Sequence, residues 1–350
     1  MSAPFDPNAA APADSGIFGL PYGADEARLV YLPVPWEATT SYRGGTAAGP
    51  DAILAASHQV DLFDLEVDRP YEVGLHLLPA DPQVTLWNAE ARPLAEQVIA
   101  VGGVVGDDAG LKRARDRVNT LSGQLNDAVY QRFLGLYEAG KLPALLGGDH
   151  STPFGAIRAA SERHPGLGVL QVDAHMDLRK AYEGFTWSHA SIMHNVLAHL
   201  PGVARLAQVG IRDFCEEEVE VAAAAGDRVR VWYDADLAAR RFEGGTWRQT
   251  VADILAGLPK DVWISFDIDG LDPRLCPNTG TPVPGGLDFH EAAYLVAAVA
   301  RSGRRIVGFD LNEVAPGADE WDANVGARLL YKMSAWTLMS QGLRRERLRG

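Results

Sequence analysis

The chain is poor in cysteine and in basic residues and lacks a long apolar run, and each shortage excludes a class of protein. Cys215 and Cys276 are the only cysteines among 350 residues, too few for a disulfide framework or a four-cysteine zinc site. No apolar run approaches the roughly 20 residues that a membrane-spanning helix needs. The N-terminal residues lack the basic and apolar regions of a secretory signal peptide. The sequence therefore predicts a cytoplasmic protein with free thiols and no membrane partner.

Basic residues are outnumbered by acidic ones, 32 against 46, which gives a formal net charge of −14. An acidic chain without basic clusters repels phosphate backbones, so a nucleic-acid partner is not expected. A small cationic molecule is a better match for this charge. The composition, 47% hydrophobic and 22% charged residues, is typical of a packed globular enzyme and excludes wholesale disorder.

Short apolar runs alternate with amphipathic stretches along most of the chain. Residues 1–25, rich in Ala, Pro, Asp and Gly, show no periodicity and are predicted to form a mobile tail. Residues 26–350 are expected to form a single domain. Seven apolar runs in that domain are predicted to be strands: 29–34, 142–146, 168–172, 206–211, 229–233, 262–268 and 305–311.

The stretches between these strands read as helices. Apolar residues from Val118 to Leu136 recur at spacings of three and four, which places them on one helical face. Pro50 suits the first turn of a helix, Thr152 and Pro153 do the same after residue 146, and residues 324–338 form a final helix. Buried strands separated by helices predict a three-layer α/β/α fold with a mostly parallel central sheet.

Acidic residues gather directly after four of the predicted strands. The segments there read GGDHS at 147–151, DAHMD at 173–177, FDIDGLDP at 266–273 and DLNE at 310–313. The carboxyl ends of parallel strands lie at one edge of a sheet, where ligands bind. We therefore expect these side chains to lie close together.

So many carboxylates in a partly buried cleft cannot all stay ionised without a compensating cation. Residues two apart on a strand point to the same face, and 267 and 269 share this spacing with 173, 175 and 177. Imidazole and carboxylate ligands without sulfur suit manganese or another mid-series divalent ion. The sequence predicts two divalent metal ions that share bridging carboxylates, held by six ligands: His150, Asp173, His175, Asp177, Asp267 and Asp269.

Three of these segments closely resemble the signature motifs of the ureohydrolases, the family of arginases and agmatinases. They are GGDHS at 147–151, DAHMD at 173–177 and SFDIDGLDP at 265–273, in the family's order. The resemblance extends from about residue 29 to residue 335. It implies an arginase-like α/β/α fold with a binuclear manganese site, nickel in some members, assembled as a homotrimer or homohexamer. The six ligands named above carry over by motif.

The resemblance also implies a reaction, the hydrolysis of a guanidino compound to urea and an amine. Asp269 is similar to the metal ligand that also steadies the attacking nucleophile. His189 is similar to the histidine that passes a proton to the departing amine. Glu313 is similar to the acid that binds the guanidinium group through paired hydrogen bonds. These three residues are the catalytic candidates.

The substrate is less clearly marked. In arginases, an acid two positions after a GxRD turn binds the α-amino group, and an asparagine after the DAHxD motif contacts the α-carboxylate. Here Cys215 and Arg179 stand at those places. Both differences oppose arginine as the substrate, although the acids at 216–218 lie nearby. Asp213, within the GxRD turn, is a candidate substrate-binding residue.

Further segments resemble an agmatinase-like bacterial branch, some of whose members hydrolyse free guanidine. They are PWEATTSY at 35–42, TGTP at 279–282 and WDANVG at 321–326. The expected reaction is agmatine to putrescine and urea, with guanidine to urea and ammonia as the alternative, then an arginase or a guanidinobutyrase. Trp187, two residues before His189, is a candidate substrate-binding residue whose ring shortens the pocket; its alternative role is packing.

Two other functions stay open. Metal-dependent deacetylases of acetylated polyamines share a related fold but use one catalytic ion, and the carboxylates at 173, 177, 267 and 269 favour two. A metal-binding relative without catalysis is opposed by the presence of His189 and Glu313.

Overall fold

One parallel sheet organises the molecule. The computed structural model describes residues 5–12 and 14–347, and within them eight strands pair in the order β2-β1-β3-β8-β7-β4-β5-β6. Every pairing is parallel. The strands are β1 Leu29–Val34, β2 Leu75–Leu77, β3 Leu142–Gly147, β4 Leu167–Val172, β5 Val203–Ile211, β6 Val229–Tyr233, β7 Asp261–Asp267 and β8 Arg305–Asn312.

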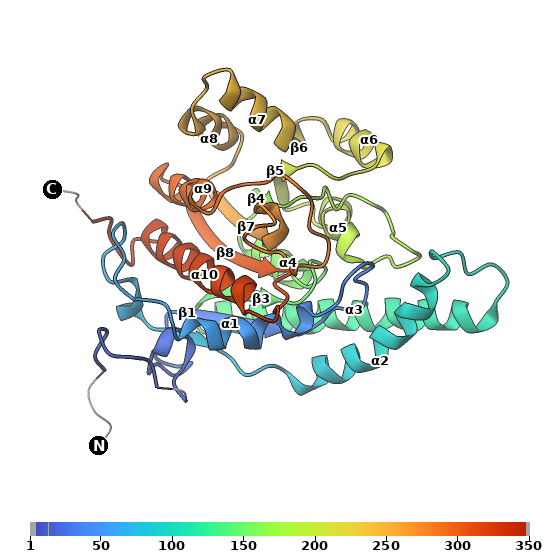
Figure 1. Cartoon of the computed structure of the whole chain (residues 1–350), viewed down its shortest axis with the longest axis horizontal. Helices are drawn as coiled ribbons and strands as arrows, with labels where there is room; N and C mark the ends of the chain where they lie inside the picture. Colours follow the sequence, from blue (N-terminus) through green and yellow to red (C-terminus); the bar gives the residue numbers. More distant parts are fainter. Residues whose placement is uncertain (1–4, 13, 348–350) are drawn as a thin grey trace.

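Helices cover both faces of the sheet (Figure 1). They are α1 Gly49–Ser57, α2 Pro82–Ile99, α3 Ala109–Glu138, α4 Phe154–Arg163, α5 Ile192–His199, α6 Glu216–Ala224, α7 Asp234–Phe242, α8 Trp247–Ala256, α9 Phe289–Arg301 and α10 Trp321–Ser340. One apolar core packs α1, α8, α9 and α10 against the sheet, and the other packs α2, α3, α4 and α5. The three-layer α/β/α arrangement follows from these two cores.

Six of the seven predicted strands match the structure to within one residue at each end, and the seventh, predicted over 206–211, begins earlier, at Val203. The predicted helical stripe from Val118 lies within α3, and the final helix extends from Trp321 to Ser340. The edge strand β2 was not predicted. Its three residues, Leu75–Leu77, are too few to show a period.

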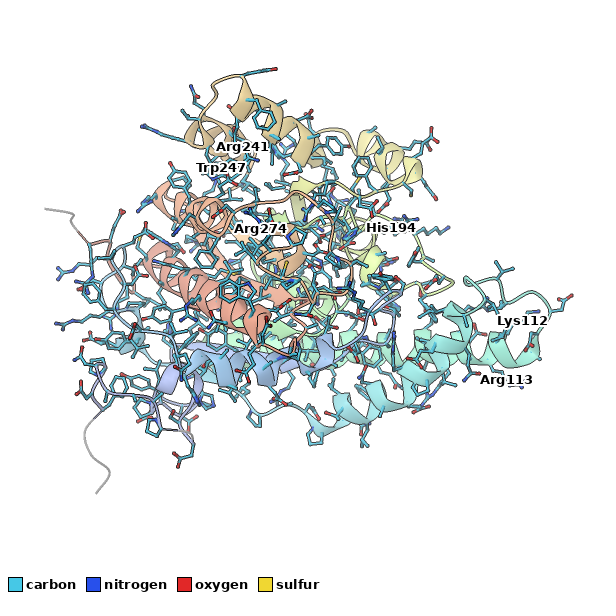
Figure 2. The ribbon with its side chains drawn as sticks, in the orientation of Figure 1. Lys112, Arg113, His194, Arg241, Trp247 and Arg274 are labelled. Carbon is cyan, nitrogen blue, oxygen red and sulfur yellow. The ribbon has the colours of Figure 1, made fainter. Side chains whose placement is uncertain are left out.

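The long helices α2 and α3 form an arm that projects beyond the rest of the molecule (Figure 1). Figure 2 shows Lys112 and Arg113 at its outer end, in the first turns of α3. The side chain of Asp108 caps this helix by accepting hydrogen bonds from the amides of Gly110 and Leu111. The inner half of the arm is packed, because Val118, Leu121 and Leu125 of α3 are buried.

The N-terminal segment differs from the prediction. Ile17, Phe18 and Leu20 are buried in the core beside α1 and α10. The ring of Phe18 packs at 5.0 Å from that of Tyr331, and its amide donates to Ser57 Oγ at 2.9 Å. The mobile tail predicted over residues 1–25 is therefore wrong for residues 17–20, because their apolar side chains complete the core. Residues 1–4 and 13 of that tail lie outside the described residues.

Of the helices in the described residues, none has the length and apolarity to cross a bilayer.

Candidate metal centre and active site

The acidic segments meet at the carboxyl ends of the four central strands of the sheet. The strands that precede them, β3, β8, β7 and β4, are neighbours in the sheet order. Since all four run parallel, their carboxyl ends lie side by side, as the sequence predicts. The structure brings all six predicted metal ligands together there.

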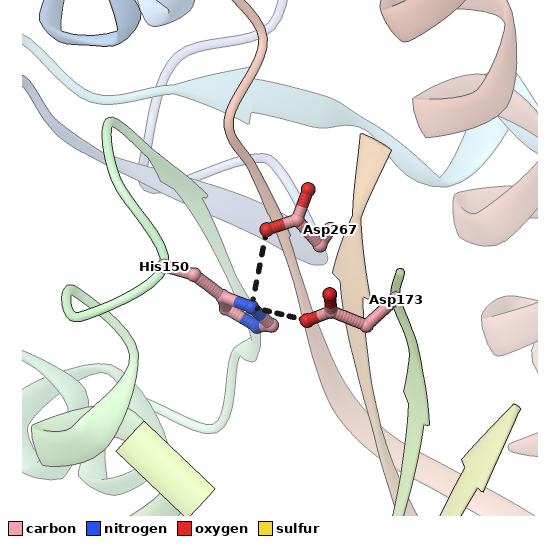
Figure 3. A group of neighbouring side chains, drawn as sticks. All are labelled: His150, Asp173 and Asp267. Carbon is pink, nitrogen blue, oxygen red and sulfur yellow. Dashed lines mark ion pairs between the residues drawn. The ribbon is translucent and has the colours of Figure 1, made fainter. Parts of the chain in front are cut away.

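One group of candidate ligands consists of His150, Asp173 and Asp267 (Figure 3). The Nδ1 atom of His150 lies 2.9 Å from Asp173 Oδ2 and 3.3 Å from Asp267 Oδ2. Asp177 Oδ2 is a third carboxylate oxygen, 3.1 Å from the same nitrogen. All four side chains are buried, and within the described residues Nδ1 makes no hydrogen bond of good geometry. One buried nitrogen facing three carboxylates is the arrangement expected around a cation.

A second group consists of Asp173, His175 and Asp269. The Nδ1 atom of His175 lies 3.1 Å from Asp269 Oδ2 and 3.5 Å from Asp173 Oδ1. Asp173 thus belongs to both groups and turns Oδ2 toward His150 and Oδ1 toward His175. A carboxylate shared in this way is suited to bridge two ions, so the donor set fits two divalent cations.

The charges in this cluster strongly affect one another. Burial, reinforced by the charge of Asp173, raises the pKa of Asp177 to about 8 and that of Asp267 well above its ordinary value. Burial lowers the pKa of His150 and His175, but the surrounding carboxylates outweigh it and raise both. Carboxyl groups in this cluster therefore keep their protons at a pH at which isolated carboxyl groups are ionised. Bound divalent cations would compensate the negative charges in place of these protons.

A buried hydrogen-bond chain orients His150. Its Nε2 lies 2.9 Å from Ser265 Oγ, and that hydroxyl donates to Asp310 Oδ1 at 2.9 Å. Burial raises the pKa of Asp310 to about 6. Asp310 therefore supports a ligand from behind and does not itself belong to either ligand group. Ser265 and this role of Asp310 were not predicted, since no spacing distinguishes a residue behind a ligand from one in the core.

His189 lies at the start of a short 3-10 helix, His189–Ser191. Its Nδ1 is 3.3 Å from the hydroxyl oxygens of both Thr39 and Ser188, and its amide donates to Thr39 Oγ1 at 3.2 Å. Among the described residues, Nε2 has no hydrogen-bond partner. Burial and the charges of His175 and His150 lower the pKa of His189 to about 3, which keeps the ring neutral near pH 7.

Glu313 follows β8 and is 4% exposed. Its Oε1 accepts a hydrogen bond from the amide of His150 at 2.9 Å, whereas Oε2 has no partner in the described part of the chain. Burial and the nearby Asp149 raise the pKa of Glu313 well above its ordinary value. A buried carboxylate oxygen without a donor beside the ligand groups is suited to a cationic substrate.

Two side chains of the GxRD turn, Arg212 and Asp213, have different environments. Arg212 is structural: it donates to the carbonyl oxygens of Gly210, Asp269 and Val283, joining β5 to the loop after β7. Asp213 is exposed, with 69% of its side chain accessible, and its Oδ2 lies 4.0 Å from His175 Nε2. Asp213 thus lies at the outer rim of the second ligand group.

Glu218 already has hydrogen-bond and ion-pair partners within the chain. It is buried and accepts hydrogen bonds from the amides of Leu178 and Cys215, both at 3.0 Å, and its Oε2 is 3.5 Å from Arg179 Nε. It therefore cannot serve as a free acid in place of Cys215, and it offsets the charge of Arg179.

The ring of Trp187 packs among helices. Its centroid is 4.8 Å from that of Phe154 and 5.8 Å from that of His199, and its Nε1 faces Gly123 of α3. The ring nearest His189 is that of Tyr182, at 6.0 Å and perpendicular to the imidazole. This position favours the packing role for Trp187 over the pocket-shortening role. No sequence pattern predicted Tyr182, because the contact depends on the path of a loop.

Known proteins share this architecture. The solved structure of proclavaminate amidino hydrolase from Streptomyces clavuligerus superposes with a TM-score of 0.70 at 22% identity, covering 95% of this chain and 100% of that chain. At this identity the likeness concerns the fold, and it confirms the predicted arginase-like α/β/α class.

The amino-acid sequence has related proteins as well. It is 34% identical over 320 residues to N(1)-aminopropylagmatine ureohydrolase of Thermus thermophilus, covering 90% of this chain and 92% of that protein. It is 30% identical over 298 residues to agmatinase of Bacillus cereus, covering 85% and 87%. These relatives confirm the prediction of an agmatinase-like ureohydrolase. The model of the arginase family matches residues 27–335, and the chain therefore belongs to the arginase family.

Proposed function

We propose that this chain binds two divalent metal ions and hydrolyses agmatine to putrescine and urea. The observation that carries the proposal is Asp173, whose two carboxylate oxygens face two separate histidines. The names of the relatives from Thermus thermophilus and Bacillus cereus support a guanidino substrate that ends in an amine.

The metal ions would be held by the six residues that the structure brings together. His150, Asp173, Asp177 and Asp267 would hold one ion, and Asp173, His175 and Asp269 would hold the other. We propose manganese as the ion, with nickel as the alternative. Divalent ions at such a site acidify water and so supply a nucleophile at neutral pH. Asp269, whose Oδ2 faces His175 and whose Oδ1 accepts from the amide of Ala174, would also steady that nucleophile.

The chain's own residues bind and orient the substrate. The unpaired Oε2 of Glu313 accepts hydrogen bonds from the guanidinium group. The positive charge of that group favours the ionised form of Glu313, which burial disfavours. At the rim, Asp213 is exposed to solvent, with its Oδ2 4.0 Å from His175 Nε2. A carboxylate there suits the ammonium group at the far end of agmatine, so the substrate spans the site from Glu313 to Asp213.

His189 carries the proton. Its Nδ1 is anchored by the hydroxyls of Thr39 and Ser188, which leaves Nε2 for the substrate. A neutral imidazole at pH 7 would accept one proton of the attacking water and pass it to the substituted nitrogen of the substrate. The second proton, from the hydroxyl group that becomes the urea carbonyl, completes the ammonium ion of the departing amine.

Arginine is opposed by the residues that surround the rim. Cys215 offers no charge to an α-amino group, and Glu218 is already paired with Arg179. The homotrimer or homohexamer and the cytoplasmic location that the sequence predicts remain predictions.

Urea release by purified protein loaded separately with manganese or nickel tests the proposal. The substrates are agmatine, N(1)-aminopropylagmatine, 4-guanidinobutyrate, arginine and free guanidine. Preference for agmatine with manganese supports the proposal. Preference for guanidine, particularly with nickel, overturns the role of Asp213. Release of acetate from acetylated amines with one ion per chain, or no product from any guanidine, overturns the hydrolysis itself.

A further inference from the structure

A short hairpin joins the metal-binding segment at 173–177 to His189. Tyr182 and Phe185 exchange both backbone hydrogen bonds, at 3.1 and 2.9 Å. The two residues between them, Glu183 and Gly184, have φ angles of 50° and 83°. Two left-handed residues in succession are typical of a type I′ turn, which fixes the direction of the side chains that flank it. The hairpin thus has one defined conformation.

The arm of α2 and α3 holds this hairpin from outside. The side chain of Asn119 on α3 donates to the carbonyl oxygen of Gly184 at 3.1 Å and accepts from the amide of Thr186 at 2.9 Å. Gly103, in the loop between α2 and α3, packs so closely on Glu183 that an added Cβ would lie 2.5 Å from its Cα. These contacts bring the arm to within a few residues of the candidate active site.

The inner end of the hairpin carries Tyr182 against His189. The two rings are perpendicular, with centroids 6.0 Å apart. The guanidinium of Arg179 lies over the ring of Tyr182 at 4.9 Å from its centroid. Arg179 is itself held by buried Glu218 at 3.5 Å, and its amide donates to the carbonyl oxygen of Ala190 at 3.2 Å. The ring of Tyr182 is therefore held on one side by a fixed cation.

The hydroxyl groups of Thr39 and Ser188 reach only Nδ1 of His189. At 3.3 Å both contacts are long for hydrogen bonds to a hydroxyl, so they restrain the rotation of the imidazole about its Cβ–Cγ bond only weakly. The perpendicular ring of Tyr182 limits this motion, since edge-to-face aromatic contact has a preferred geometry. The hydroxyl of Tyr182 has no hydrogen-bond partner among the described residues, so the ring is the part of the side chain that acts.

We infer that Tyr182 is a positioning residue: held by Asn119 and Arg179, it fixes the ring of His189 for proton transfer. The inference rests on the proposed function of His189. The matched pair of variants is Tyr182→Leu, which removes the ring, and Tyr182→Phe, which keeps it. Tyr130→Leu is the control. Tyr130 lies on α3 with Arg158 over its ring at 3.9 Å, a similar cation–aromatic pair outside the site.

Steady-state urea release should separate these variants. Tyr182→Leu should lower kcat by about 10- to 100-fold with KM changed less than about twofold, because small misplacements of a catalytic group reduce rate more than binding. Tyr182→Phe and Tyr130→Leu should keep kcat within about twofold. Asn119→Ala, which loosens the hairpin without touching either ring, should lower kcat by roughly threefold to tenfold.

Crystal structures of the wild type and of Tyr182→Leu give a readout that does not depend on turnover. The imidazole of His189 should occupy one orientation in the wild type and a different or mixed one in the variant. An unmoved ring with unchanged kcat overturns the inference. An effect on KM alone would make Tyr182 a substrate contact, and equal losses in the Phe and Leu variants would assign the effect to the hydroxyl; both also overturn it. A wild type that releases no urea, with a ring that still moves in the variant, refutes the proposed function and leaves the positioning intact.

Discussion

The two halves of the candidate site are built in different ways. The candidate metal ligands follow neighbouring strands of one parallel sheet, and their positions depend on strand register. His189 lies on a loop that is held by side chains from the segment around Thr39, from α3 and from α6. The sheet therefore places the groups that can hold metal, whereas long-range contacts place the group that we propose moves a proton. Changes to the first should remove metal, and changes to the second should lower the rate with metal still present.

The largest effect is expected for Asp173→Asn, in the half of the site that can hold metal. Loss of the shared charge should reduce bound metal from two ions per chain to at most one and lower urea release by roughly a thousandfold, about 4 kcal/mol. Metal analysis and urea assay measure both quantities. Asp261→Asn is the control, because Asp261 lies at the opposite end of β7 and pairs with Arg305. Two retained ions in Asp173→Asn would contradict the bridging role.

His189→Ala should act on the rate alone. We expect kcat to fall about 100-fold or more, the usual contribution of a general acid–base group, while both ions remain bound. His199→Ala, a histidine packed against Trp187 outside the ligand groups, is the control. If metal content falls with the rate, His189 belongs with the ligands and the division between the two halves is incorrect.

Ser265→Ala tests whether a residue that contacts only a candidate ligand changes the affinity for metal without changing the reaction. Without the hydroxyl between His150 and Asp310, the affinity for metal should fall about 10- to 100-fold, as for other residues that orient a ligand. Titration of metal-free protein measures this change. Urea release at saturating metal should recover to within a fewfold of the wild type, and failure to recover would place Ser265 in the reaction itself.

The smallest effect is expected at the rim. Asp213→Asn should raise KM for agmatine roughly fivefold to tenfold, about 1 kcal/mol for a partly exposed ion pair, and leave KM for free guanidine unchanged. Glu216→Gln, an exposed acid on the neighbouring α6, serves as the control. An equal rise for both substrates would show that Asp213 acts on the ligand His175 and not on the substrate's amine.

The same division explains what could be predicted from the sequence. Strands, the parallel sheet and the ligand set follow from local patterns, because apolar runs and carboxylates two residues apart are visible without tertiary contacts. Ser265, Thr39 and Tyr182 gave no such signal, since their roles arise from partners 115, 150 and 7 residues away in the chain. Phe18 lies in a composition typical of a tail, yet its ring fills a gap beside Tyr331 that the folded chain alone creates.

Asp177 and Glu313 have φ angles of 54° and 62°, a left-handed backbone that costs a residue with a side chain about 1 kcal/mol or more. Both carboxyls are also buried among other acids. Natural selection for stability alone would favour glycine or asparagine at these two positions. These two residues therefore lower the free energy of unfolding of the chain. The metal-free Asp177→Gly and Glu313→Gly variants should have higher melting temperatures than the metal-free wild type. At Asp177 and Glu313, the substitution that should raise the melting temperature is also the one that should remove the proposed activity.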